Sequence, residues 1–165
     1  MAQARQTRVV EAAARKVGDT SWSLAAVRRS PQGNFGSYEP KCNLFVAEML
    51  AEGGFDVPLK DASPSRRTII TSFREYFSGQ LEGKRPPKAE EWFEGTVAET
   101  TLVGEGLAAF PRCWPGDIIC SMSHVGIVQG VRSTISASTS GEVVQNDWGW
   151  RKGEAQSIRI FRYHP

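Results

Sequence analysis

The stretch KCNLFVAEML, residues 41–50, decides how the rest of the chain is interpreted. Apolar residues fill most positions after Cys42 and Asn43, so we expect a helix buried in the core, ended by Gly53-Gly54. A thiol in the first turn of a helix meets unpaired backbone N–H groups and the positive end of the helix dipole, and both favour thiolate. Cys42 is therefore a candidate nucleophile. The alternative is a buried, inert thiol, which is common for free cysteine.

Length, composition and charge exclude several classes of protein. The 165 residues are enough for one domain with a core, and we expect a single domain over 1–165. A net charge of +2, without a basic run interleaved with aromatic residues, argues against a nucleic-acid partner. No apolar stretch approaches the ~20 residues that cross a bilayer, so we expect no membrane insertion. The N-terminus lacks the apolar segment of a signal peptide, which predicts synthesis in the cytoplasm without a cleaved leader.

The three cysteines do not indicate a metal site. Cys42, Cys113 and Cys120 include no C-x-x-C spacing, so we expect neither a zinc site nor any other cofactor. We interpret Cys113 and Cys120 as reduced packing residues.

The order of the helical and strand patterns predicts an α+β fold. Helical spacing is found in the first part of the chain. The predicted helices cover 6–17, 22–29, 42–52, 65–78 and 89–93. The helix over 22–29 is a short one, expected within the loop that precedes Cys42. Strand-like alternation follows, and the predicted strands cover 117–120, 124–131, 134–138, 142–147 and 157–163. The segment 134–138 is interpreted as continuing the strand before it beyond a kink. Helices followed by consecutive strands favour N-terminal helices packed on an antiparallel sheet. We interpret residues 79–106 as a lid or specificity loop.

A cysteine nucleophile needs a base, and the chain offers two histidines. His164 is the penultimate residue, where chain ends fray. His124 opens a β-branched strand and is the better partner for Cys42. Taken alone, a single histidine in a strand is more often structural than catalytic.

The base in turn needs a third group that orients it, and a neighbouring strand should supply that group. Asn146 and Asp147 are the candidates, with Gln145 behind them. An oxygen acceptor there would hold the imidazole of His124 in one tautomer. Alternation puts Gln145 and Asp147 on one face of the strand and Asn146 on the other, which does not choose between them. The alternative reading is that Asn146-Asp147 opens a turn before Trp148-Gly149.

Three ordered segments resemble the signatures of NlpC-type cell-wall cysteine peptidases, a superfamily with a papain-like fold that includes the CHAP amidases and the amidase effectors of type VI secretion. They are Lys41-Cys42-Asn43-Leu44-Phe45-Val46, Trp114-Pro115-Gly116-Asp117-Ile118-Ile119 and Ser123-His124-Val125-Gly126-Ile127-Val128-Gln129-Gly130. The resemblance covers about residues 38–147. Two positions depart from the family pattern, since Lys41 stands where Asp is usual and Asn43 where Ser is usual.

The resemblance implies a cysteine amidase or endopeptidase that acts on peptidoglycan stem peptides. Cys42 would be the nucleophile and His124 the base, with Asn146 or Asp147 as the third residue. The backbone N–H of Cys42 would contribute to the oxyanion site, and Tyr38 and Asn43 are the expected substrate or oxyanion residues. Lys41 would favour the thiolate by its charge. Asp117 has a plainer interpretation, as a cap on backbone N–H groups in a tight turn.

The resemblance also implies a setting for the activity. A leaderless, single-domain protein of this kind would be an antibacterial effector delivered to the periplasm or cell wall of a target cell, with a cognate immunity protein as partner. A phage lysin of the CHAP type is one alternative. A catalytically silent binding module on the same scaffold is another.

Overall fold

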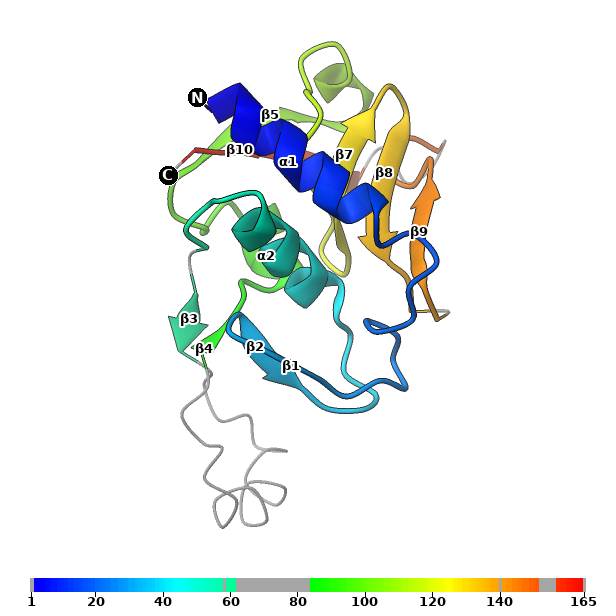
Figure 1. The fold of residues 1–165 in the computed structure, drawn as a ribbon. Helices are drawn as coiled ribbons and strands as arrows, with labels where there is room; N and C mark the ends of the chain where they lie inside the picture. Colours follow the sequence, from blue (N-terminus) through cyan, green and yellow to red (C-terminus); the bar gives the residue numbers. More distant parts are fainter. Residues whose placement is uncertain (1, 58, 62–83, 140, 152–156, 165) are drawn as a thin grey trace.

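The chain folds around a six-stranded antiparallel sheet (Figure 1). In this computed structural model the described residues are 2–57, 59–61, 84–139, 141–151 and 157–164. The strand order is β5-β10-β6-β7-β8-β9. The strands, in chain order, are β5 (Thr100–Glu105), β6 (Ile118–Cys120), β7 (Val125–Gly130), β8 (Ser133–Ala137), β9 (Val143–Asn146) and β10 (Arg159–Tyr163).

Two N-terminal helices, α1 (Ala2–Ala14) and α2 (Cys42–Glu52), lie together over one face of the sheet (Figure 1). The residues of α2 from Cys42 to Leu50 are buried, as the apolar pattern predicts. The main core between helices and sheet includes Val9, Ala12, Ala13, Leu44, Phe45, Val46, Leu50, Ile118, Val125, Ile127, Ile135 and Val143. Burial of this apolar surface is the principal force that holds α2 against β7 and β8.

The opposite face of the sheet carries a second, smaller core. Strand alternation sends Ile118 and Cys120 toward the helices and Ile119 to this other side. The second core consists of Ala109, Ile119, Val128, Trp150, Ile158 and Ile160. The short 3₁₀ helix η1 (Gly106–Ala109) contributes Ala109 to it. Both faces of the central strands are therefore buried, which explains why β6 is apolar throughout.

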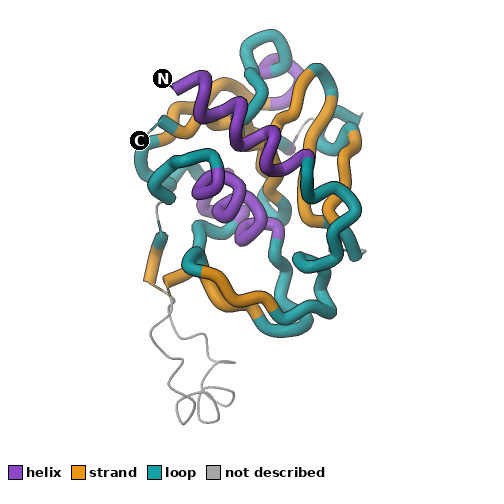
Figure 2. Tube along the Cα trace, viewed as in Figure 1, coloured by secondary structure: helices purple, strands orange, loops and turns teal. Residues whose placement is uncertain are grey.

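The helix expectations are met at α2 and at α4 (Ala89–Phe93). Gly54, just beyond α2, has a φ of +87°, the left-handed conformation that glycine tolerates. α1 begins and ends earlier than the predicted 6–17. The predicted helix over 22–29 is wrong, because a hairpin of β1 (Arg28–Ser30) and β2 (Gly33–Phe35) is formed instead (Figure 2). The helix predicted over 65–78 lies outside the described residues.

The strand expectations need two corrections. β8 does not continue β7 but turns back and pairs with it antiparallel, with Ile127 opposite Ile135. β5 falls within the predicted lid over 79–106 and is instead an edge strand of the sheet, paired with β10. β10 also pairs with β6, so the chain's last strand lies inside the sheet. A separate two-stranded sheet joins β3 (Lys60–Asp61) to β4 (Lys84–Arg85).

The Pro115-Gly116-Asp117 turn has the capping role expected of it. The fully buried carboxylate of Asp117 accepts a hydrogen bond from the backbone N–H of Trp114 at 2.7 Å. It also accepts two hydrogen bonds from the guanidinium of Arg162, both at 2.8 Å. The turn is thus tied to β10, and the sequence Pro-Gly-Asp has a structural explanation. Across the part of the chain that is described, no helix has the length and apolarity needed to cross a bilayer.

Candidate active site

Cys42 is the first residue of α2 and is 6% exposed. Burial raises the pKa of its thiol, and hydrogen bonds from the backbone of Val125, Asn43 and Cys42 itself act in the opposite direction. The sulfur therefore lies beside the start of β7. Because burial is the larger effect, the thiol is neutral at neutral pH unless a base takes its proton.

His124 immediately precedes β7 and is held by the turn after β6. Its backbone N–H donates to the hydroxyl of Ser121 at 3.2 Å, and its carbonyl accepts from the N–H of Ser121 at 2.8 Å. The imidazole Nε2 lies 3.0 Å from the hydroxyl oxygen of Ser136 on β8. The edge of the ring also packs against Trp148, with centroids 4.6 Å apart and planes at 89°. The ring is thus oriented by a hydroxyl and by an aromatic wall.

Gly126 explains how β8 comes close enough for this contact. A Cβ built at Gly126 would lie 2.9 Å from the Cβ of Ser136, which is closer than real side chains approach. Glycine at this position therefore lets β7 and β8 pair with Ser136 under the imidazole of His124. The His-Val-Gly order in the sequence has a local physical reason.

Cys42 and His124, which come from opposite halves of the chain, line the same small pocket. Its volume is about 70 Å³. The remaining lining residues are Trp22, Leu24, Pro40, Lys41, Ser123, Ala137, Ser138 and Thr139. A thiol and an imidazole around one cavity are the chemical components of a nucleophile and its base.

The two predicted third residues make their described hydrogen bonds elsewhere. The side-chain oxygen of Asn146 accepts from the N–H of Trp148 at 2.9 Å and lies 3.5 Å from the hydroxyl of Thr134. The carboxylate of Asp147 is about half exposed and pairs with Arg151 at 2.5 Å, which lowers its pKa. Asn146-Asp147 therefore opens the turn toward Trp150, as the alternative reading has it.

Ser136 is the residue that the sequence reasoning missed. It is buried on β8 and is the described hydrogen-bond partner of the His124 ring. The available signal was the pair Thr134 and Ser136, two polar residues at alternate positions that share one face of β8. That signal was lost because 134–138 was interpreted as an extension of β7 rather than as its hairpin partner.

The residues expected near the oxyanion site are placed differently from one another. Asn43 is buried beside Cys42 in the first turn of α2. Tyr38 is 83% exposed, has a φ of +66° and is not among the residues that line the pocket. Its backbone N–H donates to the carbonyl of Leu24, so Tyr38 belongs to the loop that forms the pocket wall.

Lys41 is buried, and its ammonium donates to the carbonyl oxygens of Ser23 and Glu39 at 3.1 and 2.9 Å. Burial lowers its pKa. The groups that lower the pKa of Cys42 are backbone N–H groups, so the described role of Lys41 is to fasten this loop to the start of α2.

Cys113 and Cys120 are not part of the pocket. All three cysteines are free. Cys120 is buried between β10 and the main core, and burial raises the pKa of its thiol to about 12. Cys113 lies partly buried against the carbonyl of Phe110. Both are in the packing positions expected of them.

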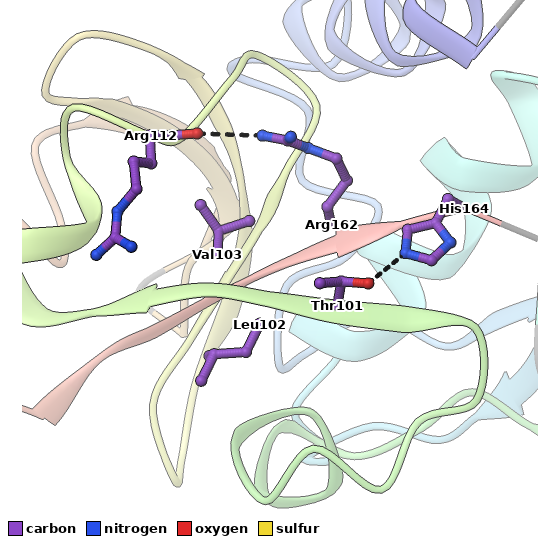
Figure 3. Close-up of a pocket in the computed structure, with 6 residues that line it drawn as sticks. All are labelled: Thr101, Leu102, Val103, Arg112, Arg162 and His164. Carbon is purple, nitrogen blue, oxygen red and sulfur yellow. Dashed lines mark hydrogen bonds between the residues drawn. The ribbon is translucent and has the colours of Figure 1, made fainter.

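A wider depression of about 390 Å³ lies over β5 and β10 (Figure 3). Its lining residues are Thr101, Leu102, Val103, Arg112, Arg162 and His164. Arg162 points to the carbonyl of Arg112, and His164 contacts Thr101 (Figure 3). It contains no cysteine, so it has no nucleophile of the kind that Cys42 offers. His164, the second histidine, is therefore occupied away from Cys42.

The described residues contain no cluster of His, Cys, Asp and Glu that would hold a metal ion. Comparison with protein-family models, with curated proteins and with solved structures finds no match for this chain.

Proposed function

We propose that this protein is a cysteine hydrolase that cleaves amide bonds, an amidase or endopeptidase of papain-like type. The observation that carries the proposal is that Cys42 and His124 line the same pocket, and that Nε2 of the imidazole lies 3.0 Å from the hydroxyl oxygen of Ser136 on β8. A nucleophile, a base and a group that orients the base are the three parts that such chemistry requires.

In the proposed mechanism Nδ1 of His124 takes the proton of the Cys42 thiol while the sulfur attacks the amide carbonyl. The C–N bond then breaks, the acyl group stays on sulfur as a thioester, and the imidazolium gives its proton to the leaving amine. A water molecule, deprotonated by His124, hydrolyses the thioester and restores the thiol. Because burial holds the thiol neutral, His124 acts as a general base at the moment of attack.

The start of α2 supplies electrostatic support for this step. The backbone N–H groups of Cys42, Asn43 and Val125 point toward the sulfur region. A carbonyl oxygen that becomes negative during attack would be stabilised by N–H groups at this helix N-terminus. The proposed oxyanion site is therefore backbone, with the N–H of Cys42 as its first member.

We propose peptidoglycan stem peptides as the substrate class and a secreted antibacterial effector of type VI kind as the biological setting. The support is the ordered resemblance at Cys42, Asp117 and His124 to NlpC-type peptidases. An immunity protein that blocks the pocket would be the natural partner. A phage-type lysin uses the same chemistry and differs only in how the protein reaches the wall.

A second candidate function is a binding module with an inert thiol. It is favoured by one observation, the 6% exposure of Cys42 and the resulting rise in the pKa of its thiol. Such a module would bind wall peptides in the pocket without cleaving them.

The deciding experiment incubates peptidoglycan sacculi with the wild-type protein, Cys42→Ala and the matched control Cys113→Ala, and identifies released muropeptides by mass spectrometry. We expect fragments with the wild type and Cys113→Ala and none above background with Cys42→Ala. Equal products from all three proteins would refute the assignment of Cys42. Binding of sacculi without any cleavage by the wild type would establish the second candidate.

A further inference from the structure

The pocket beside Cys42 is small and has one apolar wall. Its volume is about 70 Å³, which is room for a few water molecules. For comparison, an engineered apolar cavity of roughly 150 Å³ in another protein binds benzene. At about half that volume, the pocket favours a methyl-sized group over a branched or aromatic side chain. Trp22 and Leu24 contribute apolar side chains to the lining of this pocket, together with Cys42 and His124.

The side chain of Trp22 is held in place by several contacts, so it does not move easily to admit a larger substrate group. Its indole N–H donates to the buried carboxylate of Glu48 at 2.8 Å. Arg28 stacks over its ring at 3.8 Å and donates to the same carboxylate at 2.9 Å. The edge of Phe45 packs against it, with ring centroids 5.3 Å apart. A side chain held by a hydrogen bond, a stacked cation and an aromatic neighbour forms a rigid wall.

We propose that this pocket is a specificity subsite that accepts a glycine- or alanine-sized residue next to the cleaved bond, with Trp22 and Leu24 setting the size limit. The inference rests on the proposed function, since it concerns the substrate residue whose carbonyl Cys42 attacks. The cleaved amide is then one whose acyl side is glycine or alanine. In an apolar site of fixed shape, each added methylene changes turnover by about tenfold or more.

Peptides that differ only in the residue on the acyl side of the cleaved bond test this directly. For the wild type we expect kcat/KM for glycine or alanine to exceed that for leucine by at least about tenfold. Leu24→Ala enlarges the pocket and should reduce that ratio at least several-fold. Leu107→Ala makes the same change at a leucine that is 55% exposed on η1 and should leave the ratio unchanged.

A second measurement separates this inference from the proposed hydrolysis. Alkylation of Cys42 by iodoacetamide and by N-phenylmaleimide is followed by mass spectrometry of the Cys42 peptide, with N-acetylcysteine as reference. We expect the ratio of the maleimide rate to the iodoacetamide rate to be about tenfold lower at Cys42 than for N-acetylcysteine. Leu24→Ala should remove most of this difference. Should Leu24→Ala fail to fold, Thr139→Leu, at the exposed rim, should narrow the pocket and increase the selection against the maleimide.

The outcomes are distinct. If no peptide is cleaved but the labelling shows the size limit, the proposed hydrolysis fails and the subsite stands. If leucine and alanine peptides are cleaved equally fast, or the two reagents label Cys42 in the same ratio as N-acetylcysteine, the subsite is overturned.

Discussion

Nε2 of His124 and the hydroxyl oxygen of Ser136 lie 3.0 Å apart, across the pairing of β7 with β8. This contact places Nε2 against a fixed partner, and in the proposed mechanism Nδ1 is the nitrogen that takes the proton of the Cys42 thiol. Ser136 touches the base rather than the substrate, so it is a positioning residue.

Ser136→Ala should lower kcat by roughly tenfold, corresponding to the loss of a hydrogen bond worth about 1.4 kcal/mol. KM should change little, and the acidic limb of the pH–kcat profile should shift because the environment of His124 changes. Ser136→Thr, which keeps a hydroxyl, should recover part of the activity. The matched control is Ser133→Ala on the same strand, whose hydroxyl bonds Gln129. An unchanged kcat and pH profile for Ser136→Ala would show that the hydroxyl does not orient the base.

The rate at which iodoacetamide alkylates Cys42 should depend on His124. A base that shares the thiol proton makes thiolate available at neutral pH despite burial, so Cys42 should react faster than the buried Cys120, whose pKa is about 12. His124→Ala should lower the alkylation rate of Cys42 at pH 7 by about tenfold or more. In this variant the rate should rise in a single step at alkaline pH, where the thiol loses its proton without a base. His164→Ala is the matched control and should have no effect. Equal rates for Cys42 with and without His124 would favour the inert thiol.

Arg162→Ala should destabilise the protein by about 3 kcal/mol, because it leaves the fully buried carboxylate of Asp117 without its cation. Arg112→Ala is the control, since among the described residues the exposed side chain of Arg112 makes a single long hydrogen bond, of 3.4 Å, to the carbonyl of Ala108. Urea unfolding measures both free energies. Similar losses for the two variants would mean that the Asp117–Arg162 pair contributes little beyond a surface contact.

Glu91 should make the fold sensitive to acid. Hydrogen bonds from Arg85 are the main cause that lowers the pKa of its carboxyl to about 2, with the N–H of Lys88 and the side chain of Lys60 adding to them. A depressed folded pKa gives stability that is fully present above the ordinary value of 4.5 and is lost as pH falls from there toward 2.

The contribution of Glu91 should amount to about 1–2 kcal/mol, after allowance for partial solvent screening. Comparing the free energy of unfolding of the wild type and Glu91→Gln from pH 6 to pH 2 checks this. The difference should be constant above pH 5 and shrink below pH 4.5. Glu90→Gln, at an exposed neighbour, should show no such trend. A pH-independent difference for Glu91→Gln would contradict the assignment.

Local sequence patterns were sufficient for the elements whose limits are marked by residues near them in the chain. The apolar run behind Cys42 and the two glycines after it predicted α2 with its correct bounds, and the α+β class was predicted from the order of helices and strands. Cys42 and His124 were recognisable as candidates because their residue types and their places, at a helix start and a strand start, are read from neighbours in the chain.

The tertiary structure decided what depends on pairing between distant segments. The sequence of β5 has only a weak strand pattern, and this segment is a strand because its backbone pairs with that of β10. β8 turns back and pairs with β7, although the sequence alone also allowed it to continue β7. Register across the β7–β8 hairpin therefore placed Ser136, and not a β9 residue, in the described hydrogen bond to the His124 ring. The size of the pocket was likewise outside the reach of sequence reasoning, because it depends on how far Trp22 and Leu24 stand from Cys42 after the core has closed.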